Sequence, residues 1–115
     1  MRYILLFCGT QADQEAFDSM SPEALQERYG RVGTWFGDHS SRIRASNQLQ
    51  PRETATTVRL GKRGPVITDG PFIEGNELIG GYAEIEVDEF DDALTMAKTW
   101  PGGGAVEIRP VFEQG

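Results

Sequence analysis

The chain has 115 residues and a mass of 12.7 kDa, which predicts a single globular domain spanning residues 1–115. Its formal net charge of −7 argues against nucleic acid and anionic membranes as partners. We see no apolar run that could span a membrane and no signal segment, so the sequence predicts a cytoplasmic protein. A single cysteine, Cys8, and a single histidine, His39, exclude an internal disulfide and a Cys/His metal cluster, and we expect no metal or cofactor.

The charge is unevenly distributed along the chain. Residues 1–65 carry nine basic and seven acidic side chains, whereas residues 66–115 carry two basic and eleven acidic ones. Within the second half, residues 84–92 hold six acidic side chains in nine positions. The basic and acidic segments either face one another, face a partner, or form two solvated surfaces.

The first predicted elements are a strand and a helix. Residues 2–8 are apolar at odd and even positions alike, which predicts a strand covered on both faces. A polar loop should follow. Ser21-Pro22-Glu23 then has the features of a helix start, and apolar residues at helical spacing carry that helix to about Gly37. Glycines at 30, 33 and 37 indicate either a close approach of backbone or ligand, or a frayed helix end.

The middle of the chain predicts a hairpin. Residues 39–53 are polar, with a short edge strand expected at 47–51. Residues 54–60 alternate and are rich in β-branched side chains, and a Gly-Lys-Arg-Gly turn leads into residues 65–68, so the two segments should pair. Residues 69–82 are interpreted as an ordered excursion between strands.

The last third predicts a strand, a helix and a strand. Residues 82–87 alternate, with alanine, isoleucine and valine on one face. Asp88 is the predicted cap of a second helix, whose apolar face runs from Phe90 to Trp100. The final strand is expected over residues 105–112, after a Pro-Gly-Gly-Gly stop.

This order, β-α-(ββ)-β-α-β, predicts an α+β, ferredoxin-like fold. Two helices cover only one face of such a sheet. Since the predicted strands carry apolar residues on parts of both faces, we expect the uncovered face to pack against a second copy in a two-fold homodimer.

The segment Asp69-Gly70-Pro71-Phe72, followed by Gly80-Gly81-Tyr82, resembles the DGPF-type members of the YCII-related proteins. The first strand, the start of the first predicted helix and residues 49–59 and 106–110 are similar to that family as well. The resemblance implies a dimeric α/β barrel, the fold of muconolactone isomerases and antibiotic-biosynthesis monooxygenases. It implies little about activity, because a fold alone does not define one.

In the wider family a His–Asp pair is proposed as an acid/base dyad. Here Tyr29 or Gly30 stands near the expected histidine position, and the only histidine, His39, follows the helix. Asp69 and His39 are therefore the candidate catalytic residues, because a carboxylate beside an apolar ring such as Phe72 and an imidazole are both suited to proton transfer. The alternatives are a turn-forming Asp69 and an exposed loop His39.

A larger set of residues is expected to contact a ligand, through aromatic rings, a hydroxyl group or glycine backbone. These residues are Tyr29, Gly70, Pro71, Phe72, Gly80, Gly81 and Tyr82. The sequence thus predicts a cytoplasmic homodimer that binds a small organic molecule inside the barrel, with cofactor-free acid/base chemistry as the candidate reaction. The alternative, which the resemblance implies, is an accessory partner of an extracytoplasmic-function sigma factor.

Overall fold

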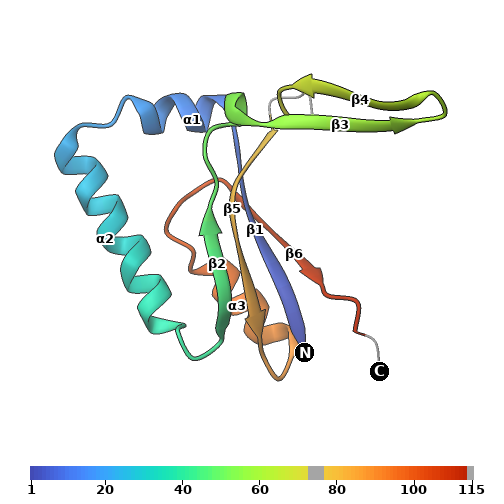
Figure 1. The fold of residues 1–115 in the computed structure, drawn as a ribbon. Helices are drawn as coiled ribbons and strands as arrows, with labels where there is room; N and C mark the ends of the chain where they lie inside the picture. The colour runs from blue at the N-terminus through green and yellow to red at the C-terminus, as the bar shows by residue number, and fades with distance from the viewer. Residues whose placement is uncertain (73–76, 114–115) are drawn as a thin grey trace.

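The computed structural model describes residues 1–72 and 77–113. Its helices and strands in chain order are β1 (Arg2–Thr10), α1 (Gln11–Asp18), α2 (Pro22–Asp38), β2 (Ile43–Gln48), a 3-10 turn (Arg52–Thr54), β3 (Thr56–Gly61), β4 (Gly64–Asp69), β5 (Glu77–Glu86), α3 (Phe90–Lys98) and β6 (Ala105–Pro110) (Figure 1).

Four of the strands form an antiparallel sheet in the order β2-β5-β1-β6. This is the strand order of a split β-α-β-β-α-β unit, in which β1 and β5 occupy the centre. Strands β3 and β4 form a separate two-stranded sheet, inserted between β2 and β5 in the chain. The predicted α+β class and the predicted hairpin are both confirmed.

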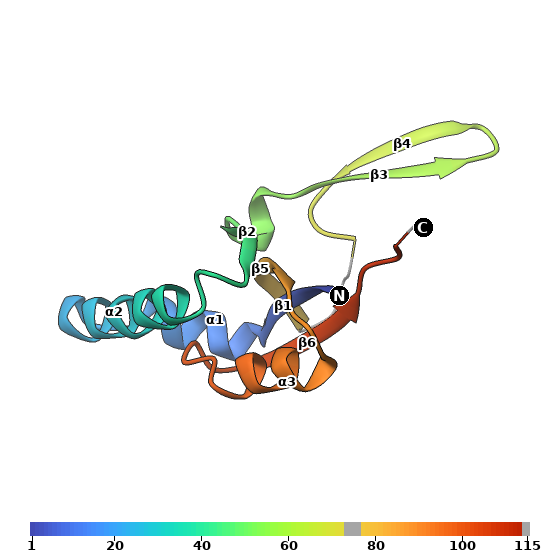
Figure 2. The same cartoon turned by 90° about the horizontal axis from the view of Figure 1, so that it is seen from below.

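Helix α3 lies on one face of the four-stranded sheet, whereas α2 stands beside the sheet, beyond the edge strand β2 (Figures 1 and 2). On that face Leu5 and Ile85 are completely buried, and Met96 of α3 packs against them without any exposed surface. Trp35 of α2 adds its ring to the same cluster. The opposite face carries the alternate residues of β1, among them Ile4, which the chain's own helices leave half-buried. The first strand was predicted to be covered on both faces, and one chain covers only one of them.

Residues 11–18, predicted as part of a polar loop, form the helix α1 instead. Thr10 begins it with a capping box, since its hydroxyl accepts from the Asp13 N–H while the Asp13 carboxylate accepts from the Thr10 N–H. Two backbone donors are thereby satisfied at once. The Thr10–Asp13 capping box can be recognised in the sequence. However, the helix buries none of its residues, so the apolar periodicity that indicates a helix is weak.

Helix α2 confirms the predicted start and end. The Ser21 hydroxyl accepts from the Ala24 N–H, proline occupies the first turn, and the helix ends at Asp38. Its glycines do not meet another part of the chain, because a Cβ built on Gly30, Gly33 or Gly37 finds no described atom within 4 Å.

Further boundaries differ from the prediction, and the last strand ends at Pro110 rather than at residue 112. The edge strand spans Ile43–Gln48 rather than residues 47–51, because pairing with β5 sets its register. Strand β5 begins at Glu77, well before the predicted start at 82, so the excursion is shorter, and residues 73–76 lie outside the described part. Helix α3 is capped by Glu89, which shares a capping box with Asp92, and not by Asp88.

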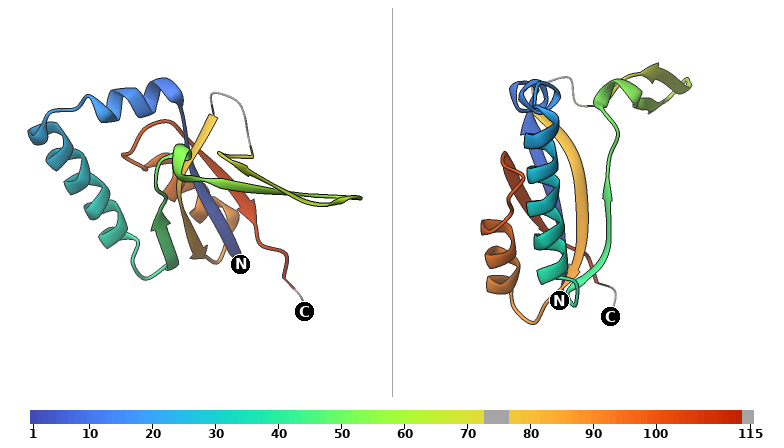
Figure 3. Two further views of the ribbon diagram at one scale, coloured as in Figure 1. Left: turned by 45° about the horizontal axis from the view of Figure 1, so that its top comes forward. Right: turned by 90° about the vertical axis from the view of Figure 1, so that its left-hand side faces the viewer.

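The β3–β4 hairpin projects from one end of the sheet, on the side away from α3 (Figures 2 and 3). The chain extends 48 × 48 × 18 Å and has a radius of gyration of 16.3 Å, whereas a compact domain of this length has about 13 Å. A single copy is therefore less compact than a typical domain, and part of the chain lies away from the core.

Within residues 1–72 and 77–113, none of the helices combines the length and the apolar character that crossing a membrane would require.

Candidate functional site

The predicted site residues lie in three separate parts of one chain. Asp69, Gly70, Pro71 and Phe72 end the hairpin, whereas Gly80, Gly81 and Tyr82 belong to the central strand β5. Tyr29 and His39 lie on α2 and just beyond it. Because β4 ends at one end of the sheet and α2 ends at the other (Figure 1), a single chain does not bring Asp69 and His39 together.

The segment after β4 is a tight turn that requires glycine. Gly70 has a φ of 111°, which side chains other than glycine rarely tolerate. Its N–H donates to the Ala55 carbonyl at 2.7 Å, and its carbonyl accepts from the Thr57 hydroxyl at 2.6 Å. These bonds hold exposed Asp69 at the base of the hairpin, where it pairs with Thr56.

Phe72, a predicted ligand contact, is exposed at the end of the hairpin. Its ring is 72% exposed, and the Arg59 guanidinium lies 5.7 Å from the ring centre, a cation–π distance. The aromatic ring of the Asp69-Gly70-Pro71-Phe72 segment is therefore available to contact a molecule that packs against the hairpin.

The glycine pair of β5 admits another strand. A Cβ on buried Gly81 would lie 2.8 Å from the Asn47 carbonyl oxygen of β2. Leu49 donates its N–H to the Gly80 carbonyl at 2.8 Å, which extends the contact. Gly80 and Gly81 stay predicted ligand contacts, and the close approach that the structure shows at this pair is one of backbone.

Next to this glycine pair, Tyr82 turns toward the uncovered side of the sheet. Its hydroxyl oxygen accepts a hydrogen bond from Asn47 Nδ2 at 2.9 Å. A phenol that accepts in this way still has its own proton to donate.

We call the uncovered side the open sheet face. It consists of the side chains that alternate with the buried ones: Ile4, Leu6 and Cys8 of β1, Asn47 of β2, Ile79, Tyr82, Glu84 and Glu86 of β5, and Glu107 and Arg109 of β6. On its two central strands, apolar side chains of β1 lie beside the Tyr82–Asn47 pair and the half-buried Glu84, which is opposite Ile4. Ion pairs lie toward its edges, Arg44 to Glu86 at 3.2 Å and Arg109 to Glu107 at 3.9 Å.

His39 lies on the other side of the molecule. It caps the end of α2, is half-buried, and places its ring 4.9 Å from the Trp35 ring centre. It lines a cavity of about 450 Å³ between α2 and α3, together with Asp38 and Thr99. The cavity is open and lies apart from Asp69.

Tyr29 makes an edge contact with the Phe17 ring of α1 at 6.1 Å and is 49% exposed. It is directed neither to the open sheet face nor to the cavity beside His39. Its assignment as a ligand contact remains a prediction, without another site residue beside it in the same chain.

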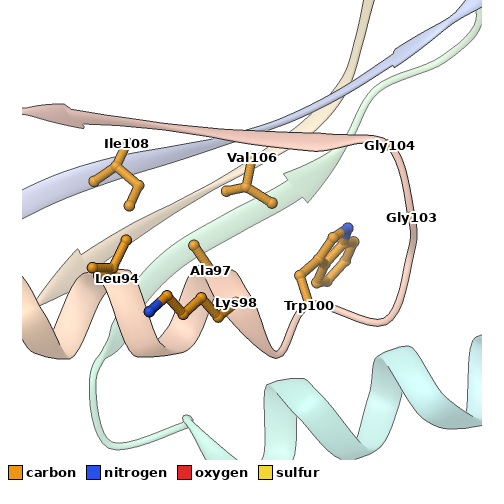
Figure 4. A pocket seen from close by; sticks show the side chains of 8 residues that line it. All are labelled: Leu94, Ala97, Lys98, Trp100, Gly103, Gly104, Val106 and Ile108. Atoms are coloured by element: carbon orange, nitrogen blue, oxygen red, sulfur yellow. The ribbon is translucent and has the colours of Figure 1, made fainter.

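A second cavity, of about 360 Å³, lies between α3 and β6 (Figure 4). Leu94 and Ala97 point from the helix toward Val106 and Ile108 on the strand, and Lys98 supplies the ammonium group among the labelled side chains. Sequence reasoning did not find it, because it arises where the turn after Trp100 separates helix and strand. It lies between the packed layers, apart from the predicted site residues.

Among the residues that the structure describes, no group of three or more His, Cys, Asp or Glu side chains is placed to hold a metal ion.

Comparisons with known proteins agree with the fold. No protein-family model matches the sequence. An uncharacterized protein of Rhizobium meliloti (strain 1021) is 28% identical over 92 residues, which cover 76% of this chain and 68% of that protein.

Among solved structures, the chain is similar to 5-chloro-2-hydroxyhydroquinone dehydrochlorinase from Burkholderia phenoliruptrix AC1100, in complex with 2,5-dihydroxybenzoquinone. The TM-score is 0.52 at 13% identity, and the match covers 99% of this chain and 96% of that one. At this identity the likeness concerns the fold alone.

Proposed function

We propose that this protein is a two-fold homodimer of the YCII/DGPF type, whose open sheet faces enclose a small organic molecule. The observation that carries the proposal is the Tyr82–Asn47 hydrogen bond, placed within a face of half-buried apolar side chains. A site of this kind is mostly apolar, with a few polar groups that fix the orientation of the ligand.

The chemistry of the open sheet face favours an oxygen-bearing ring as the ligand. Leu6 pairs with Tyr82 across β1 and β5, so an apolar surface adjoins a phenol that can donate a hydrogen bond. A quinone or phenolate oxygen is a suitable acceptor for that proton. The similar dehydrochlorinase was solved with a dihydroxybenzoquinone, which supports the use of this fold for such a molecule.

Asp69 remains the candidate acid/base group of the proposed site. Its carboxylate is exposed on the hairpin, and the imidazole predicted as its partner lies at the other end of the same chain. Any proton transfer by Asp69 therefore involves the bound molecule, or groups of the second copy, rather than His39 of its own chain.

Ligand binding is tested by thermal unfolding with 2,5-dihydroxybenzoquinone as the probe. The protein should carry Cys8→Ser, because a quinone can react with a thiol on the same face. We expect the ligand to raise the Tm by several degrees at concentrations well above Kd, since it stabilises only the folded state. Tyr82→Phe should remove most of this rise by deleting the donor.

Tyr29→Phe is the matched control, because it deletes the same hydroxyl from α2, away from the open sheet face, and should leave the rise unchanged. Asp69→Asn tests whether the hairpin carboxylate belongs to the site. The proposed site would be contradicted if the probe left the Tm of every variant unchanged. It would also be contradicted if Tyr82→Phe and Tyr29→Phe reduced the rise in Tm equally.

A further inference from the structure

The β3–β4 hairpin has an apolar face that the described residues of its own chain leave uncovered. Val58 pairs with Ile67, and Leu60 lies on the same face two positions along. Their exposed fractions are 50%, 70% and 86%. Exposed apolar surface of this kind marks a place of interaction.

The hairpin also lacks the support that a two-stranded sheet needs. It forms a sheet of its own and projects past the end of the four-stranded sheet (Figures 1 and 2). Two strands alone are at best marginally stable in water, and packing against a further element supplies what is missing. Among the described residues, α3 lies on the other side of the sheet and α2 lies beyond its β2 edge, away from the hairpin, so this support has to come from elsewhere.

The charges of the molecule indicate where the hairpin docks. The hairpin tip carries Lys62 and Arg63, whereas Glu84 and Asp88 lie at the other end of the open sheet face, where β5 leads to α3. Within one chain the basic and acidic segments meet where β2 pairs with β5, through the Arg44–Glu86 ion pair. The predicted alternative in which they face one another is thus realised in part, whereas the basic hairpin tip lies away from the acidic segment. Exposed Met1 lies at the acidic end, bonded through its backbone to Val87, which adds apolar surface beside the acids.

We propose that the hairpin is an arm exchanged between two copies of the chain. Its apolar face, Val58, Leu60 and Ile67, covers the end of the partner's open sheet face, and its basic tip reaches the partner's acidic segment. A two-fold axis perpendicular to the strands produces both contacts at once, because it places opposite ends of the two open faces against each other. The inference rests on the homodimer of the proposed function.

The exchange also makes the Asp69 site a shared one. Alternate residues of a strand share a face, and the Thr56–Asp69 pair lies two positions from the Val58–Ile67 pair. Docking the apolar face therefore turns Asp69 toward the partner. A single chain would then hold an incomplete site, which accounts for the distance between Asp69 and the other predicted residues.

The test measures the dimer Kd by light scattering and sedimentation. Leu60→Asp should raise Kd by about tenfold or more, since it places a charge in an apolar contact. Val66→Asp is the matched control: Val66 is 58% exposed on the opposite face of the same hairpin and should leave Kd unchanged. Circular dichroism should show that both variants keep the fold.

Charge reversal identifies the contact. Lys62→Glu with Arg63→Glu should weaken the homodimer, and Glu84→Lys with Asp88→Lys should do the same, because each makes both contacts repulsive. Mixing the two variants should restore a heterodimer, in which each contact again joins opposite charges. High salt should reduce all of these differences.

The results of these experiments distinguish a failure of the exchanged arm from a failure of the proposed homodimer. A monomeric wild-type protein overturns both the dimer and the arm, and leaves the acidic segment available to a different protein. A wild-type dimer that Leu60→Asp and the charge reversals do not weaken overturns the arm and leaves the dimer intact. Failure of the mixed variants to associate overturns the pairing of tip and acidic segment.

Discussion

Replacing Trp35 by alanine is expected to lower the free energy of unfolding by about 3–5 kcal/mol, the usual range for a buried tryptophan. The ring is 4% exposed and is packed at right angles to Phe7 and Trp100, with centroid distances of 5.9 and 5.0 Å. It is the residue through which α2 enters the core. Removing it leaves a cavity where the end of that helix meets α3 and the sheet.

Trp35→Phe is the control for the polar part of this contact. The indole N–H donates to the Met96 carbonyl at 3.1 Å and to the Thr99 hydroxyl at 3.2 Å. The Met96 carbonyl keeps a donor from Thr99 when the indole is lost, so phenylalanine should lower stability by only about 1 kcal/mol plus a small packing loss. Chemical denaturation with far-ultraviolet circular dichroism measures both variants. A loss under 1 kcal/mol for the alanine variant would mean that α2 does not dock through Trp35.

Replacing Gly104 by alanine should be the other strongly destabilising change, with a loss of about 3 kcal/mol or more. Gly104 has a φ of 71°, and a Cβ there would overlap the Cys8 carbonyl oxygen of β1. Since that oxygen belongs to a central strand, the neighbour cannot move aside without disturbing the sheet. The substitution combines backbone strain with a clash against the backbone.

Gly103→Ala separates these two causes. Gly103 has a nearly equal φ of 74°, but a Cβ built on it meets no described atom within 4 Å. Only the left-handed backbone is then penalised, by about 1–2 kcal/mol. Equal losses in urea unfolding of the two variants would show that the turn before β6 does not approach β1 as described.

Local sequence signals predicted the elements whose determinants lie within a few residues. Ser21 and Pro22 defined the start of α2, and the Gly61–Gly64 turn defined the β3–β4 hairpin. The alternation of Ala83 with Glu84 in β5 separated the buried face from the open one. Where a local signal was weak or ambiguous, as at the Thr10 capping box and the Asp88–Glu89 helix start, the prediction was wrong.

The candidate site was less accessible to sequence reasoning than the fold. The DGPF and GGY segments drew attention to Asp69 and Tyr82, but nothing in their spacing shows that Asn47 of an edge strand bonds the Tyr82 hydroxyl. That contact depends on the register between β2 and β5, which backbone pairing over many residues sets. The same register places the Asn47 carbonyl against Gly81, which gives a structural reason for a residue without a side chain at that position.

The sequence by itself determined the class of fold, the α2 start, the hairpin and the uneven distribution of charge, because each depends on local chemistry or composition. Only the tertiary structure decided that the basic hairpin tip and the acidic segment lie at opposite ends of one chain, and that Asp69 and His39 lie apart. Those facts depend on where the sheet places segments distant in sequence, and the pattern of one segment contains no information about the position of another. The net charge of −7 thus excluded classes of partner, whereas the arrangement of the charges pointed to a second copy of the chain.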